Sequence, residues 1–119
     1  MSTPAEFVAR SFAVRTATHI AHLQSRSYAE HVALGGFYDS LIDLVDSYAE
    51  AYQGLFGLIE DYPTTPVPTG APLSVLVDFA DWLRAHRDKL GQGETALENI
   101  LDEVVALTAQ AIYKLRFLS

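Results

Sequence analysis

Apolar residues recur along this chain at the three- and four-residue steps that are typical of amphipathic helices. The longest such stretch runs from Tyr28 to about Glu60, and one apolar stripe follows it: Leu34, Tyr38, Leu41, Val45, Tyr48, Tyr52, Leu55 and Ile59. No stretch of the sequence shows the strict two-residue alternation of a half-buried strand. The pattern therefore predicts an all-α protein.

Helix start and stop signals divide the chain into four segments. Hydroxyl caps with a glutamate three residues later begin three of them: Thr3-Pro4-Ala5-Glu6, Ser27-Tyr28-Ala29-Glu30 and Thr95-Ala96-Leu97-Glu98. Four prolines and a glycine fall in residues 61–73, and Gly91-Gln92-Gly93 ends the third segment. We predict one domain over 1–119, with helices over 4–25, 27–61, 73–90 and 94–117 and a proline-rich connection over 61–73. Short, long and short connections between four helices predict a four-helix bundle.

Charge and composition exclude several classes of protein. The 119 residues include 8 Lys and Arg against 15 Asp and Glu, a net charge of −7 that disfavours a general nucleic-acid-binding surface. The absence of cysteine excludes a thiol nucleophile, a thiolate zinc site and an iron–sulfur cluster. There is no secretory signal pattern and no apolar run of about 20 residues. We expect a cytoplasmic protein, or one carried in a virion or other particle assembled in the cytosol, without a membrane or nucleic-acid partner.

The apolar content points to a protein partner. Apolar residues make up 50% of the chain and charged residues 19%, below the roughly 25% of typical soluble domains. On so small a domain, apolar residues in this excess indicate a surface that is buried by association. We therefore expect a homo-oligomer of at least two subunits, with a larger assembly left open.

The sequence lacks the motifs of two common enzyme classes. It contains no nucleophile elbow that would hold a catalytic serine. Gly91-Gln92-Gly93 lacks both the lysine and the preceding strand of a phosphate-binding loop. The remaining reactive groups are the histidines and the carboxylates.

Three histidines and two carboxylates have a spacing that suits metal binding. His19 and His22 are three residues apart near the end of the first helix, and His31 opens the second. Asp46 and Glu50 lie one turn apart on that second helix. Imidazole and carboxylate without thiolate suit iron, manganese or zinc. Fifteen helical residues separate His31 from Asp46 by about 22 Å, so a site that uses both must lie between two chains.

This order of residues resembles the ferritin-like Dps proteins, whose ferroxidase site lies between two subunits. The resemblance implies that His31, with His19 or His22, comes from one chain, and that Asp46 and Glu50 come from its partner. His19 keeps the family's twelve-residue spacing to His31. His22 precedes Leu23-Gln24 much as the family's histidine precedes a Trp-Asn pair. Both alternatives remain open.

Two further segments carry the resemblance. Residues 113–118, Tyr-Lys-Leu-Arg-Phe-Leu, resemble the ending of the last Dps helix, and residues 22–54 are similar to small uncharacterised ferritin-like proteins of tailed bacteriophages. Gly35 stands where the Dps family commonly has an acid. Neither end of the given sequence is rich in lysine, and the net charge is −7. Both observations count against the DNA binding that the resemblance would imply.

The resemblance implies a ferritin-like four-helix bundle that binds iron, as a di-iron or mononuclear site, and oxidises Fe(II). Zinc and manganese are the alternative metals. The competing hypothesis is a non-catalytic ferritin-like bundle that acts as a structural or interaction protein, as in a phage virion component. Under that interpretation Asp46 and Glu50 continue a solvated acidic strip with Asp39 and Asp43, and His86 is a surface residue.

Overall fold

The computed structural model describes residues 2–118, and these form four helices and no strand. The helices are α1 (Thr3–Gln24), α2 (Tyr28–Phe56), α3 (Pro72–Gly91) and α4 (Thr95–Phe117). The prediction of an all-α chain with four helices is confirmed. Within the described range, no helix is long and apolar enough to cross a membrane.

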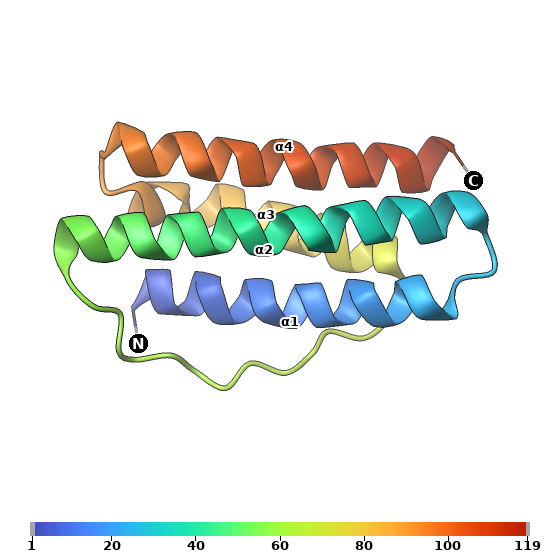
Figure 1. Cartoon of the computed structure of the whole chain (residues 1–119), viewed down its shortest axis with the longest axis horizontal. Coiled ribbons are helices and arrows are strands. Elements are labelled where there is room, and N and C mark those ends of the chain that lie inside the picture. Colours follow the sequence, from blue (N-terminus) through green and yellow to red (C-terminus); the bar gives the residue numbers. More distant parts are fainter. Residues whose placement is uncertain (1, 119) are drawn as a thin grey trace.

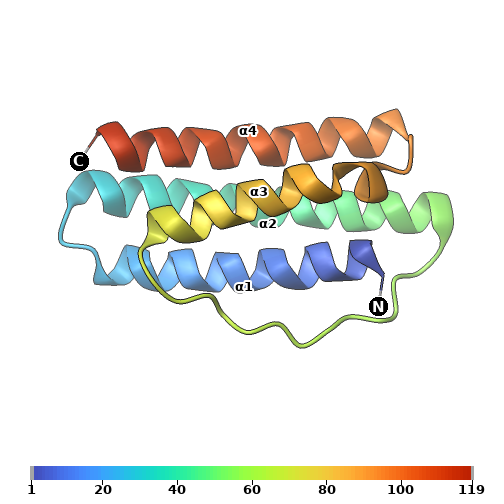
Figure 2. The same ribbon diagram turned by 180° about the vertical axis from the view of Figure 1, so that it is seen from behind.

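The four helices form a bundle of two antiparallel hairpins (Figure 1). The first hairpin is α1–α2 and the second is α3–α4, each joined by a short turn. A long connection over residues 57–71 leaves the end of α2 and runs back along the outside of α1 to the start of α3 (Figures 1 and 2). Among the described residues α1 packs on α2 and α3, and α4 packs on the same two helices. Every packed pair is therefore antiparallel.

The bundle core is apolar and contains one buried tyrosine. Its largest fully buried side chains come from all four helices: Tyr48, Phe7, Phe37, Phe79, Leu34, Leu41, Leu76, Leu83, Leu90, Leu97 and Leu101. The Tyr48 ring meets Phe7 edge-on, with ring centroids 4.9 Å apart. Its hydroxyl donates a hydrogen bond of 2.7 Å to the backbone carbonyl of Leu90, which satisfies a polar group that burial would otherwise leave unpaired.

The helix caps confirm one predicted start and correct two others. Ser27 caps α2 by accepting a hydrogen bond from the backbone N–H of Glu30, as predicted. The cap of α1 is Ser2 rather than Thr3, since the Ser2 hydroxyl accepts from the N–H of Ala5. Glu94 precedes α4 without a side-chain cap, so Thr95 lies inside the helix. The remaining predicted bounds of α1, α3 and α4 agree within a residue.

Helix α2 is shorter than predicted. It ends at Phe56 rather than near residue 61, and the connection begins at residue 57. Gly57 has a φ of 104°, a conformation that glycine adopts readily and that cannot continue an α-helix. Its N–H still bonds to the carbonyl of Gln53 and closes the last turn. Ile59, predicted as part of the helical stripe, is buried from the connection instead.

Candidate functional site

His22 and His31 face each other where α1 ends and α2 begins. Their rings stack with centroids 3.7 Å apart and planes inclined by 17°. The Nδ1 atom of His22 lies 2.6 Å from the backbone oxygen of His31, and the Nδ1 of His31 lies 2.8 Å from that of His22. Because a carbonyl oxygen only accepts, each Nδ1 carries a hydrogen and donates it. In the neutral rings this leaves the lone pair on Nε2.

Gly35 provides the space that the His22 ring occupies. A Cβ atom at Gly35 would lie 3.1 Å from Cε1 and 3.2 Å from Nδ1 of His22, which is tighter than ordinary van der Waals contact. The absence of a side chain at Gly35 therefore lets the His22 ring of α1 pack closely against α2.

His19, the third histidine near this turn, packs on Tyr38. The His19 ring stacks on Tyr38, with centroids 4.2 Å apart and planes inclined by 20°. The guanidinium carbon of Arg15 lies 5.3 Å from the centroid of the same tyrosine ring. His22 meets Tyr38 edge-on at 5.5 Å, and its ring centroid lies 6.1 Å from that of His19. Within one chain, therefore, the stacking partner of His31 is His22, while that of His19 is Tyr38.

The two carboxylates lie apart from the histidines. Asp46 and Glu50 are exposed further along α2, and over residues 2–118 no three His, Asp or Glu side chains come together as a metal site. Asp46 borders a hollow of about 310 Å³ between α1 and α2, beside the exposed rings of Phe12 and Tyr62. This exposed carboxylate therefore borders an apolar surface on its α1 side.

Sequence reasoning missed the groups that position the histidines. The sequence pattern places Tyr38 in the apolar stripe and marks Gly35 as a departure from a family pattern, and neither observation assigns these residues to the histidines. Gly35 lies four residues after His31 and Tyr38 lies seven residues after it, so all three share one face of α2. This spacing could have indicated that Gly35 and Tyr38 contact the histidines.

His86 is less exposed than the sequence analysis predicted for a surface residue. It is half-buried, its ring stacks on Trp82 at 4.2 Å, and its Nδ1 lies 2.8 Å from the Trp82 backbone oxygen. The guanidinium of Arg10 lies over the same indole ring, 4.8 Å from its centroid. The partial burial of His86 is therefore explained by packing on Trp82, whose ring also lies under Arg10 of α1.

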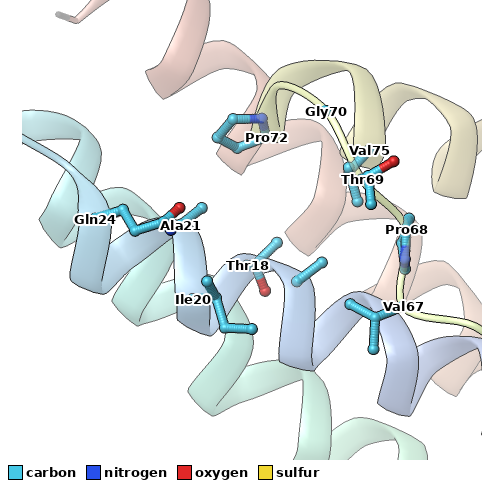
Figure 3. A pocket seen from close by; sticks show the side chains of 11 residues that line it. Thr18, Ile20, Ala21, Gln24, Val67, Pro68, Thr69, Gly70, Pro72 and Val75 are labelled. Atoms are coloured by element: carbon cyan, nitrogen blue, oxygen red, sulfur yellow. The ribbon is translucent and has the colours of Figure 1, made fainter.

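A second hollow lies between α1 and the long connection (Figure 3). It measures about 280 Å³, and the side chains of Thr18, Ala21 and Gln24 face those of Val67 and Pro68 across it. None of its lining residues is titratable. The candidate chemistry of the chain therefore remains with the histidine cluster and the exposed carboxylates of α2.

Fold and site together define a small all-α bundle with a paired-histidine cluster at one end. Residues 22–115 match a family of unknown function, DUF5856, and the chain belongs to this family. The chain is also similar to the "Uncharacterized 14.6 kDa protein in mobD-ri intergenic region" of Enterobacteria phage T4. The two are 24% identical over 110 residues, which cover 92% of this chain and 85% of the phage protein. No solved structure matches the chain significantly. The predicted relationship to phage proteins is confirmed at this coarse level.

Proposed function

We propose that this protein is a ferritin-like bundle that binds iron between two subunits and oxidises Fe(II). His22 and His31 of one chain and Asp46 and Glu50 of its partner are the proposed ligands. The observation that carries the proposal is the pair of Nδ1–H···O=C hydrogen bonds between His22 and His31.

These hydrogen bonds fit the role of a metal ligand. Histidines that bind metals almost always donate their other ring N–H to a carbonyl or carboxylate, which fixes the tautomer and the ring orientation. Both imidazoles meet this condition through Nδ1, so the Nε2 atoms are the donors that would face a metal. The bundle has one long connection, the arrangement of ferritin-like folds, and this supports the same class.

The position of the carboxylates specifies how two chains would pair. His31 of one copy reaches Asp46 and Glu50 of another only if the two α2 helices run antiparallel about a two-fold axis. Equal offsets along the helix place that axis between residues 38 and 41. The hollow beside Asp46 and the exposed Phe12 lie on the α1–α2 side of the bundle, where such a pairing would bury apolar surface.

The proposed ligand set suits a change in the oxidation state of iron. Imidazole nitrogen is a suitable ligand for Fe(II), and carboxylate oxygen is the harder ligand that favours Fe(III). Iron would enter as the substrate, and an external oxidant would accept its electron. The contribution of the chain is to fix the imidazole tautomers and to supply the carboxylates.

The first test measures bound iron and the rate of Fe(II) oxidation. The double variant His31→Ala, Glu50→Ala is expected to lose both relative to the native protein. His86→Ala and Asp43→Ala are matched controls, since one removes a histidine with a bonded Nδ1 and the other removes an exposed α2 carboxylate. Native protein that neither binds nor oxidises iron would exclude the proposal. Equal binding by the double variant would exclude these ligands.

A mixing experiment tests whether the site lies between chains. His31→Ala and Glu50→Ala chains are each expected to be inactive alone. In a random mixture of dimers about a quarter of the sites contain both native residues, so activity should recover to about that fraction. Recovery requires ligands from two chains, and its absence with active native protein would contradict the inter-subunit arrangement.

The second candidate function is a structural or interaction protein without turnover, as in a virion component. It is favoured by the same histidine pair, because two reciprocal hydrogen bonds and a ring stack also fasten the ends of α1 and α2 together. The phage T4 relative supports a phage setting. Stoichiometric recovery of the protein in assembled particles, without iron, would favour this candidate over the first.

A further inference from the structure

Helix α2 begins and α4 ends at the same end of the bundle (Figure 1). Large apolar side chains of these two segments are exposed. We call this group the end patch. Its members and their exposed fractions are Tyr28 (82%), Val32 (51%), Tyr113 (53%), Phe117 (71%) and Leu118 (46%). Apolar side chains gathered in this way on a small domain mark an interaction surface.

The end patch combines a hollow with a projecting ring. A hollow of about 320 Å³ lies between α2 and α4, and Ala29 and Ala33 lie on its α2 side. Tyr28, Val32 and Leu118 contribute apolar walls, and Lys114 is the only charged residue in the lining. Phe117 directly precedes Leu118 and contacts Tyr113, with ring centroids 5.9 Å apart. Phe117 does not line the hollow, but its exposed ring projects from the same last turn and C-cap of α4 that supply Lys114 and Leu118 to the lining. The hollow is large enough for such a ring, since a cavity of about 150 Å³ holds benzene.

We propose that a second copy of this chain covers the end patch, and that each copy places Phe117 in the hollow of the other. A closed two-fold interface uses the same patch on both subunits, so it requires a surface that is complementary to itself. A projecting ring beside a matching hollow meets that requirement. A partner of different chemistry would not need both features on one surface.

The exposed apolar area supplies a substantial part of what such a pairing needs. At 150–250 Å² per aromatic side chain, the exposed parts of Tyr28, Tyr113 and Phe117 amount to roughly 300–500 Å². Val32 and Leu118 add to this, against the approximately 800 Å² per partner of a standard interface. Lys114 can keep its ammonium group in water while its aliphatic stem lies along the apolar surface. The interface then buries no unpaired charge from the lining of the hollow.

This interface is separate from the α1–α2 surface of the proposed iron site. The end patch belongs to α2 and α4, whereas the hollow beside Asp46 belongs to α1, α2 and the long connection. A chain that uses two different two-fold interfaces assembles beyond a dimer. The inference does not depend on iron binding, and the two proposals can fail independently.

Disulfide trapping tests the pairing directly, because the chain contains no cysteine of its own. Tyr28→Cys and Phe117→Cys chains are prepared separately, mixed and exposed to a mild oxidant. We expect a mixed disulfide dimer well above the level formed by a control mixture of Tyr28→Cys with Phe56→Cys. Phe56 is an exposed aromatic at the other end of α2 and serves as the matched control. Equal yields from both mixtures would overturn the proposal.

Sedimentation velocity provides a second measurement on unmodified chains. Phe117→Asp should lower the association state relative to the native protein, while Phe56→Asp should not. Circular dichroism establishes that both variants remain folded. An unchanged association state in folded Phe117→Asp, or a native protein that is monomeric at all concentrations tested, would also overturn the proposal. Iron binding retained in folded Phe117→Asp would keep the two proposals separate.

Discussion

Two adjacent glycines of α2 have different surroundings. A side chain at Gly35 would press on the His22 ring, whereas one at Gly36 would enter open space. Both glycines lie in a helix interior, where alanine is preferred by about 1 kcal/mol. The difference between the two positions therefore isolates the contact with His22.

We predict that Gly36→Ala stabilises the protein by about 0.5–1 kcal/mol, as expected from helix propensity alone. Gly35→Ala should be less stable than Gly36→Ala by about 1 kcal/mol or more, because the His22 ring is held by a stack and a hydrogen bond and gives way at a cost. Urea unfolding of the three proteins measures both values. Equal stabilities for the two variants would show that the ring moves freely.

Tyr48 gives a second prediction at the scale of one residue. Burial raises the pKa of its phenol above the ordinary value of about 10, and the nearby Tyr52 raises it further. Since the folded state holds this proton more tightly, stability is complete below pH 10 and falls as the pH rises above it. At neutral pH, Tyr48→Phe should cost about 1–2 kcal/mol through the lost bond to the Leu90 carbonyl.

The difference in unfolding free energy between native protein and Tyr48→Phe should therefore shrink above pH 10. The variant lacks the buried phenol, so it avoids the alkaline loss that is specific to this residue. Tyr113→Phe is the matched control, because it removes the hydroxyl of an exposed tyrosine instead of a buried one. A difference that stays constant with pH would contradict the role given to burial.

The helix caps carry the prediction at the scale of the element. Ser27→Ala should destabilise the protein by about 1 kcal/mol, because it removes the side-chain acceptor for the first turn of α2. Thr95→Ala should change stability by less than about 0.5 kcal/mol, since Thr95 caps nothing. Chemical unfolding of the two variants measures this contrast. Equal losses of unfolding free energy would show that Thr95 does cap α4.

The sequence predicted all four helices, but it did not predict where α2 ends. The apolar spacing of α2 continues through Leu55 to Ile59, so periodicity alone extends the helix beyond its end. The backbone instead turns at Gly57, and Ile59 reaches the interior from an extended segment. Glycine at the residue after a helix was the local signal for this end.

At the scale of the whole molecule, the sequence predicted which residues could bind a metal but not the contacts that those residues make. Spacing placed His22 and His31 near one turn, yet their reciprocal bonding depends on how closely α1 and α2 approach there. Similarly, the composition indicated surplus apolar surface, and only the fold places much of it at the end patch. Contacts between helices depend on their packing geometry, which a single sequence does not specify.

Self-association should strengthen with salt. Each chain carries a net charge of −7, so two copies repel each other at low ionic strength. Screening removes this repulsion at high salt without weakening the burial of apolar side chains. Sedimentation velocity at low and high sodium chloride concentration should show the increase in the native protein. Dissociation at high salt would indicate that ion pairs, rather than the end patch, hold the copies together.

The long connection over residues 57–71 has a consequence for chain continuity. Each hairpin is closed by its own short turn, and the contacts between helices are made within and between the two hairpins, while the connection adds the buried side chain of Ile59. A cut at one of its exposed positions would therefore leave every helix–helix contact in place and remove only the tether. Two fragments, each a complete helical hairpin, would contain all the packing information of the fold. Their reassembly would be bimolecular, opposed mainly by the entropy that the intact connection saves.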